Sequence, residues 1–342
     1  MLVNTNFMLK NTYLRFKTYQ NTNKYFILVG IFCLFSYTCL IAQPIVEKHM
    51  VGKKIEGLVK ENEGLRMLIV GDWGKNGQSG QQDVADWMGV AAAQIGARFV
   101  ISTGDNFYPT GVASTDDPQW WFSFENVYRS HSLNVPWYAV LGNHDYNGNT
   151  KAQIDYGKKS MRWKMPAPYY TMAQGNVRFV FIDTCPFVKG YQNNRKSYPD
   201  LAAQDTTRQL QWIDSVLANS RETWKIVVGH HPVYSIGDHG NQHELHTQFK
   251  PILEKYKVQA YFCGHDHNLQ YHHLPNTSVH YLVSGAGGAE HTPIHATQAG
   301  VIFAKETNGF MTVQVKKETM LVCLIDEKGT IIHQVSVGLK GK

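Results

Sequence analysis

The sequence has 342 residues, of which 43% are hydrophobic, 12% aromatic and 18% charged, with a formal net charge of +6. This apolar content is enough for a packed core, and it excludes a disordered polyelectrolyte. The chain shows no repeat, heptad pattern or biased tract, which excludes collagen-like, coiled-coil and low-complexity proteins. Part of the positive charge belongs to the amino-terminal segment, so we expect no nucleic-acid binding.

The first 42 residues have the pattern of an export signal. Four basic residues and no acidic residue precede an apolar run over 25–42, and Ala42 stands where a signal peptidase would cut. The run is also nearly long enough to cross a bilayer as an uncleaved anchor. We therefore expect an exported protein with a signal peptide or N-terminal anchor over 1–42 and a single domain over 43–342.

Seven short apolar runs in the rest of the chain predict buried strands. They are 67–70, 98–102, 137–141, 178–183, 224–228, 259–263 and 280–284. Apolar residues at helical spacing predict helices over 79–96 and 205–219. Apolar and polar residues alternate over 310–337, which predicts two or three antiparallel strands. This order of elements predicts an α/β fold, built as a layered sandwich of mixed sheets.

Five of the predicted strands end in a short polar loop that opens with glycine. The loops are Gly71-Asp72-Trp73-Gly74, Gly104-Asp105-Asn106-Phe107-Tyr108, Gly142-Asn143-His144-Asp145, Gly229-His230-His231-Pro232 and Gly264-His265-Asp266-His267. Ligands collect at the carboxyl ends of strands in α/β sheets, and glycine lets the backbone turn sharply and approach a ligand closely. The five loops therefore predict one shared site.

The candidate ligands in these loops are Asp, Asn, Tyr and His side chains. They provide hard oxygen and borderline nitrogen donors without a thiolate, which suits iron, manganese or zinc and does not suit a cysteine-rich structural zinc site. Seven donors are too many for one tetrahedral ion, so we expect two ions that share a carboxylate. Taken singly, Asp72 and Asp105 could cap turns and Tyr108 could be a packing residue, but their occurrence together favours a metal site.

The five loops resemble those of the calcineurin-like metallophosphoesterases, and specifically the small, tartrate-resistant type of purple acid phosphatase. The resemblance runs from about residue 66 to about residue 290. Its most specific features are Tyr108, three residues after Asp105, and a first loop without the histidine that most of the superfamily carries. The resemblance implies an α/β/β/α sandwich of two mixed sheets flanked by helices, and a metallophosphoesterase catalytic domain with acid phosphatase activity.

The resemblance also implies a role for each candidate residue. Four side chains would bind a ferric ion: Asp72, Asp105, Tyr108 and His267. Asp105 would bridge to a second, divalent metal, which is iron, zinc or manganese. The other ligands of the second metal would be Asn143, His230 and His265. His144 and His239 match the catalytic histidines near the substrate phosphate. His231 is expected either to pack or to point outward, and it is left out of the site.

The expected chemistry is hydrolysis of small phosphomonoesters. Two cations would bind the phosphate and lower the pKa of a bound water, so that a metal-bound hydroxide attacks phosphorus. The sequence contains no P-loop and no nucleophile elbow. A phosphodiesterase or nucleotide-processing enzyme would use the same ligands, and a non-catalytic binding protein is the third hypothesis. Membrane contact is expected only through an uncleaved leader, and the oligomeric state stays open.

Three other features leave alternatives open. A disulfide between Cys185 and Cys263, or three buried thiols that include Cys323, both agree with the sequence. The aromatic stretch 120–124 could line the substrate site or belong to the core. The segment 187–204 lies where small members of the family carry an exposed loop that can restrain activity, so we expect it to be mobile and near the site.

Overall fold

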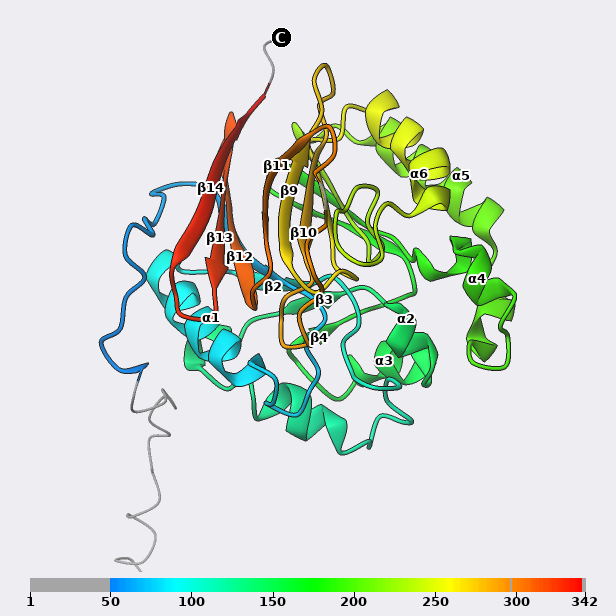
Figure 1. Cartoon of the computed structure of the whole chain (residues 1–342), viewed down its shortest axis with the longest axis horizontal. Coiled ribbons are helices and arrows are strands. Elements are labelled where there is room, and N and C mark those ends of the chain that lie inside the picture. Colours follow the sequence, from blue (N-terminus) through cyan, green and yellow to red (C-terminus); the bar gives the residue numbers. More distant parts are fainter. Residues whose placement is uncertain (1–49, 296, 340–342) are drawn as a thin grey trace, which may run out of the picture. The chain divides into compact units, whose positions relative to one another are not determined.

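Two seven-stranded sheets form the centre of the protein. Figure 1 shows the computed structural model. The structure describes residues 50–295 and 297–339. The predicted leader over 1–42 lies outside these residues. Within the described ranges, no helix is both long enough and apolar enough to cross a membrane.

The first sheet has the strand order β14-β13-β12-β1-β2-β3-β4. Strands β1 to β4 pair in parallel, and the three carboxy-terminal strands form an antiparallel extension that joins β1 through β12. The bounds are β1 Leu65–Val70, β2 Phe99–Ser102, β3 Trp137–Ala139, β4 Trp163–Lys164, β12 Gly309–Val315, β13 Thr319–Asp326 and β14 Ile331–Gly338.

The second sheet has the strand order β11-β9-β10-β8-β7-β6-β5. Its centre, β6, β7, β8 and β10, is parallel, whereas β5, β9 and β11 are antiparallel to their neighbours. The bounds are β5 Tyr170–Gln174, β6 Val177–Phe181, β7 Trp224–Val228, β8 Ala260–Cys263, β9 Leu269–His273, β10 His280–Ser284 and β11 Val301–Lys305.

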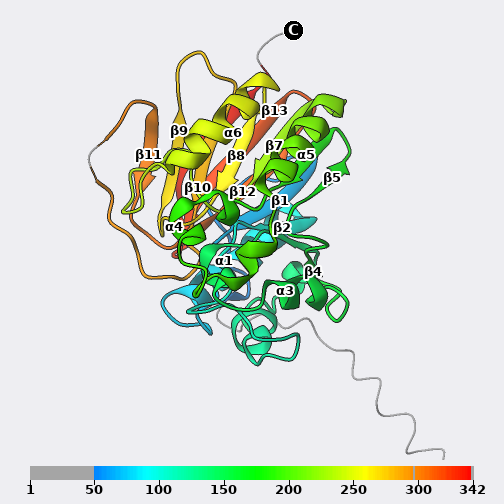
Figure 2. The same ribbon diagram turned by 90° about the vertical axis from the view of Figure 1, so that its right-hand side faces the viewer.

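Helices cover the outer faces of both sheets. The bounds are α1 Gln81–Ile95, α2 Asn143–Tyr146, α3 Thr150–Tyr156, α4 Lys189–Gln192, α5 Thr206–Asn219 and α6 His243–Lys255. Helix α1 packs on the first sheet, and α5 and α6 pack on the second, where Figure 2 shows them in front of β7 and β8. Helix α5 begins at Asp205, whose carboxylate accepts a hydrogen bond from the Arg208 N–H at 3.0 Å.

The two sheets face each other across an apolar core. The Phe99 ring of β2 meets the Phe179 ring of β6 with 5.7 Å between centroids, and Tyr138 of β3 stacks on Phe181 of β6 at 6.0 Å. Because each sheet also packs against helices on its other face, the layers are helix, sheet, sheet and helix. The predicted α/β/β/α sandwich of two mixed sheets is confirmed.

The predicted strands and both predicted helices are present, and the carboxy-terminal segment forms three antiparallel strands. Strand β9 was not predicted because Gln270, His272 and His273 break its apolar pattern, although the first two are buried. Helix α6 was also missed, and it contains Pro251, a residue that disfavours helix interiors.

The structure decides two of the open alternatives. Cys185, Cys263 and Cys323 are buried free thiols, so the disulfide alternative is wrong. The aromatic stretch 120–124 is only partly core. Trp120 and Phe124 belong to the core, whereas Trp121 and Phe122 are about 60% exposed.

Candidate metal centre

The five polar loops follow strands from both sheets and meet at one place. Backbone hydrogen bonds connect them. The Asp72 N–H donates to the Gly104 carbonyl at 2.9 Å, within the first sheet, and the Gly264 N–H donates to the His230 carbonyl at 2.9 Å, within the second. The His265 N–H donates to the Asp72 carboxylate at 3.1 Å and so joins the two sheets. The predicted site is therefore formed where the ends of both sheets come together.

The phenol oxygen of Tyr108 lies at the centre of the first group of predicted ligands. It is 3.2 Å from Asp72 Oδ1, 3.2 Å from Asp105 Oδ2 and 3.1 Å from His267 Nε2. Asp72, Asp105 and Tyr108 are buried, and His267 is half-buried. The four residues predicted to share one ion thus have their donor atoms together.

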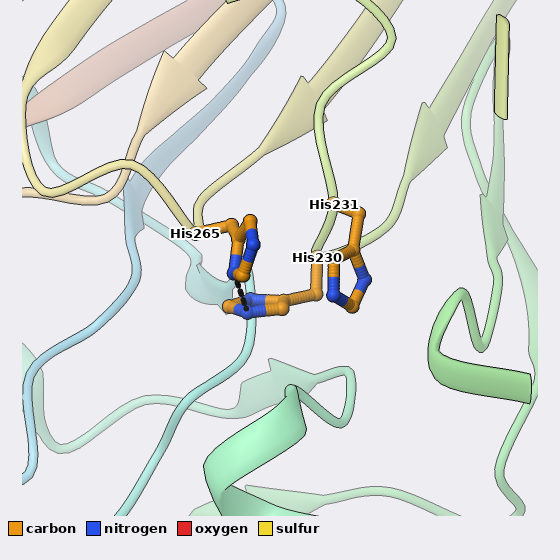
Figure 3. A group of neighbouring side chains, drawn as sticks. All are labelled: His230, His231 and His265. Atoms are coloured by element: carbon orange, nitrogen blue, oxygen red, sulfur yellow. Dashed lines mark hydrogen bonds between the residues drawn. The ribbon is translucent and has the colours of Figure 1, made fainter. Parts of the chain in front are cut away.

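The imidazole of His230 lies at the centre of the second group. Its Nε2 atom is 3.4 Å from Asp105 Oδ2, 3.1 Å from Asn143 Oδ1 and 3.2 Å from His265 Nδ1, the contact drawn in Figure 3. Candidate ligand atoms of Asp72, Asp105 and His230 all lie within 4.8 Å of one another. Asp105 Oδ2 therefore contacts both groups, as the bridging ligand of a two-ion centre would.

Backbone carbonyls orient two of the histidines. His230 Nδ1–H donates to the Thr103 carbonyl at 2.9 Å, and His267 Nδ1–H donates to the Glu290 carbonyl at 2.7 Å. Each bond directs the other ring nitrogen, Nε2, toward the carboxylates. Partners of this kind hold the tautomer and ring orientation that metal-binding histidines need.

The local backbone is strained where it presents these side chains. Asp72, Asp105 and His265 have φ angles of 59°, 47° and 73°, a left-handed conformation that non-glycine residues rarely adopt and that often marks functional sites. A Cβ atom at Gly142 would overlap the Asp105 carboxylate, and one at Gly264 would overlap the Asp72 carboxylate. Glycine at these two positions therefore leaves room for the two carboxylates.

The electrostatics of the site are dominated by burial and by close acids. Burial, with the nearby charge of Asp105, raises the pKa of Asp72 well above its ordinary value, and burial next to both carboxylates raises the pKa of Tyr108. Burial disfavours the charged forms of Asp105 and His230, but the attraction between these two charges outweighs the effect of burial. The attraction lowers the pKa of Asp105 and raises the pKa of His230 to about 9.

This donor set fits a binuclear metal centre. Two buried carboxylates and a buried phenol repel one another when they are ionised, and cations placed among them would remove that repulsion. The donors are oxygen and nitrogen atoms, with the amide oxygen of Asn143 and the imidazoles of His230 and His265 in the second group. This chemistry matches the first-row metals expected from the sequence.

The two predicted catalytic histidines border the ligand groups. The His144 N–H donates to Asp105 Oδ1 at 2.8 Å, and the half-buried His144 ring lies 4.4 Å from the Tyr108 ring. The exposed His239 ring stacks on His265 with 4.1 Å between centroids. The structure therefore brings all nine predicted site residues together.

His231 packs beside the site, and one of its ring nitrogens lies within 4.8 Å of candidate ligand atoms of His230 and His265. Its buried ring lies 4.8 Å from the His230 ring and 4.4 Å from the His265 ring (Figure 3). Its Nδ1 hydrogen-bonds Thr184 Oγ1 at 2.8 Å, and its Nε2 hydrogen-bonds Tyr191 Oη at 3.1 Å, so both nitrogens have protein partners. Tyr191 belongs to the segment 187–204, which places this segment near the site as predicted.

Sequence reasoning missed two residues that contact the site. Asp145 is fully buried and accepts hydrogen bonds from the loops after β2 and β3; its place directly after His144 was the only local signal. Lys75 follows the first loop, and its Nζ atom lies 4.5 Å from the centroid of the Tyr108 ring. No spacing in the sequence connects Lys75 with Tyr108.

Known proteins resemble this chain over most of its length. The family described as calcineurin-like phosphoesterase matches residues 65–269. Purple acid phosphatase 4 of Arabidopsis thaliana is 37% identical over 79% of this chain and 82% of its own length. Human tartrate-resistant acid phosphatase type 5 is 35% identical over 78% of this chain and 88% of its own length.

A solved structure supports the fold independently. The purple acid phosphatase PPD1 from yellow lupin (Lupinus luteus) seeds superposes with a TM-score of 0.60 at 17% identity, covering 81% of this chain and 54% of the lupin chain. The family match and the purple acid phosphatase relatives confirm the resemblance predicted from the five loops. The chain belongs to the calcineurin-like phosphoesterase family and, within it, to the purple acid phosphatases.

Proposed function

We propose that this protein is an exported acid phosphatase that hydrolyses small phosphomonoesters at a binuclear centre containing a ferric ion. The family implies a binuclear metal centre, and the grouped ligands agree with it. The observation that carries the proposal is the position of Asp105, whose Oδ2 lies 3.2 Å from Tyr108 Oη and 3.4 Å from His230 Nε2. The leader pattern over 1–42 supports export.

The two ligand groups suggest different ions. Asp72, Asp105, Tyr108 and His267 would hold ferric iron, because a phenolate and two carboxylates are hard anionic donors. Asp105 would also bind a divalent iron, zinc or manganese ion. The remaining ligands of that ion would be Asn143, His230 and His265. When bound, the two cations would attract the phosphate group and lower the pKa of a water molecule.

The chain's own residues would hold the substrate and manage its protons. His144 Nδ1–H donates to the Pro109 carbonyl at 2.7 Å, so Nε2 is the atom left to meet a substrate. A protonated His144 would donate from Nε2 to a phosphate oxygen or to the leaving group. The His239 backbone is held by the buried Asp266, which accepts its N–H at 2.9 Å, and its exposed ring would contact the same phosphate from the other side.

Metal analysis, a visible spectrum and a matched pair of variants test this proposal. We expect about two metal ions per chain, including iron, with a phenolate-to-iron absorption band and hydrolysis of para-nitrophenyl phosphate at acid pH. Asp105→Asn should lower kcat/KM at least about 100-fold. Asp155→Asn, which changes a carboxylate that pairs with exposed lysines, should not.

Each part of the proposal can fail separately. A colourless, iron-free protein with full activity would contradict the ferric ion, and a fully active Asp105→Asn variant would contradict the shared centre. Faster turnover of bis-para-nitrophenyl phosphate than of the monoester would favour a phosphodiesterase instead. Export is tested by amino-terminal sequencing of the protein recovered outside the cells that make it, and retention inside them would contradict it.

A further inference from the structure

Lys75 places a positive charge at the edge of the candidate metal centre. Its Nζ atom lies 4.5 Å from the centroid of the Tyr108 ring, and its side chain is half-buried. The same Tyr108 ring lies 4.4 Å from the ring of His144. Lys75 and His144 therefore border one phenol ring, whose oxygen belongs to the first ligand group.

The turn that carries Lys75 is held firmly. The buried side chain of Gln81 accepts hydrogen bonds from the Lys75 N–H at 3.0 Å and from the Gly77 N–H at 2.7 Å. The Asn76 N–H donates to Ser123 Oγ at 3.0 Å. These contacts fix the backbone, so the long side chain of Lys75 starts from a defined position beside the site.

Among the described residues, Lys75 forms no ion pair that would neutralise its charge. Its side-chain ammonium instead contacts the Tyr108 ring. Other described lysines do pair, for example Lys159 with Asp116 at 2.6 Å and Lys316 with Glu61 at 2.9 Å. A cation over an aromatic ring keeps its ammonium donors, so it can still bind an anion. The geometry therefore leaves one positive charge available beside the Tyr108 ring, at the edge of the candidate metal centre.

We propose that Lys75 is a substrate-binding residue that makes this site prefer phosphoesters carrying a second anionic group, such as diphosphates, over monoesters of neutral alcohols. The inference rests on the proposed function, because the metal centre and His144 would hold the first phosphate. The second phosphate would then extend toward the rim, where the Lys75 ammonium forms a charge-assisted hydrogen bond with it. A neutral leaving group has no charge for Lys75 to bind.

Binding measurements with two matched probes test this proposal. Methylenediphosphonate carries two anionic groups and methylphosphonate carries one, and isothermal titration of the metal-loaded protein gives the affinity for each. Lys75→Met should reduce the ratio of the two affinities at least about 10-fold, whereas Lys75→Arg, which keeps the charge, should retain most of it. Lys159→Met removes a lysine that pairs with Asp116 and should leave the ratio at the wild-type value.

An unchanged affinity ratio in Lys75→Met would overturn the inference. So would an equal loss of affinity for both probes together with a shifted visible band, because Lys75 would then act through Tyr108. Failure of the proposed function is recognised separately, as a metal-loaded wild-type protein that does not hydrolyse para-nitrophenyl phosphate. Since the titrations need no turnover, they still report on Lys75 in that case.

Discussion

Asn106 donates two hydrogen bonds to the Asp145 carboxylate, one from its backbone N–H and one from its side-chain amide, each at 3.1 Å. The same carboxylate accepts from the Gly142 N–H at 2.8 Å and from Gln153 Nε2 at 2.7 Å. These bonds join the loop that carries Asp105 to the loop of the third predicted strand. Asp145 is not a predicted ligand, so its contribution is to hold ligand-bearing loops in place.

Asp145→Asn should destabilise the protein by about 2–4 kcal/mol, because an amide cannot accept at both positions and leaves buried donors unpaired. Urea unfolding of the metal-loaded protein measures the change. The matched control is Asp155→Asn on α3. Its carboxylate pairs with exposed lysines, so this substitution should leave the free energy of unfolding almost unchanged. Equal stabilities of the two variants would show that the Asp145 network is unimportant.

Gly104→Ala should lower both stability and metal binding. Gly104 has φ +96°, and a Cβ atom there would lie 2.7 Å from His230 Nδ1 and 3.0 Å from the Gly142 nitrogen. Gly175→Ala is the control, because Gly175 also has a positive φ, +59°, but has no atom within 4 Å of a Cβ. Gly175→Ala should lower the free energy of unfolding by about 1 kcal/mol through backbone strain alone, and Gly104→Ala should lower it by clearly more. Thermal unfolding and metal content compare the two, and similar losses would contradict the predicted displacement of His230.

Tyr108→Phe should abolish the visible absorption band while the chain still folds. The substitution removes the phenol oxygen and keeps the ring, so stability of the metal-free protein should change by about 1 kcal/mol or less. Tyr128→Phe removes the hydroxyl of another fully buried tyrosine and should keep the band. A Tyr108→Phe protein with an unaltered band would mean that another group is responsible for the colour.

His272 should make the protein less stable as the pH falls. Burial lowers the pKa of His272 to about 4, from an ordinary value of 6.5. Between these two pH values the unfolded chain binds more protons than the folded chain, so the free energy of unfolding decreases as the pH falls through this window. The loss from this group is up to about 3 kcal/mol and is complete near pH 4.

Replacing His272 should therefore flatten the acid side of the stability profile. His272→Leu removes the titrating group, and Tm measured from pH 7 to pH 4 should fall less steeply than in the wild type. Parallel profiles for His272→Leu and the wild type would show that His272 does not titrate in this range.

Much of the fold and of the candidate site could be predicted because the signals are local. Buried strands carry continuous apolar runs. The loops after them contain the candidate ligands at characteristic spacing: Asp72, Asp105, Tyr108, Asn143, His230, His265 and His267. Strand β9 could not be predicted in this way. Its polar residues are buried because neighbouring strands and a hydrogen bond from His272 to Gln270 at 2.8 Å accommodate them.

The amino-acid sequence by itself determined which donor types stand at the ends of the strands, and so the family to which the chain belongs. Tertiary structure alone decided that one oxygen of Asp105 contacts both ligand groups, that Asp145 holds two loops together, and that Lys75 lies against Tyr108. The reason is physical. Apolar periodicity and residue chemistry can be recognised within short segments, whereas contacts between distant side chains depend on how the two sheets pack and on the direction in which each side chain points.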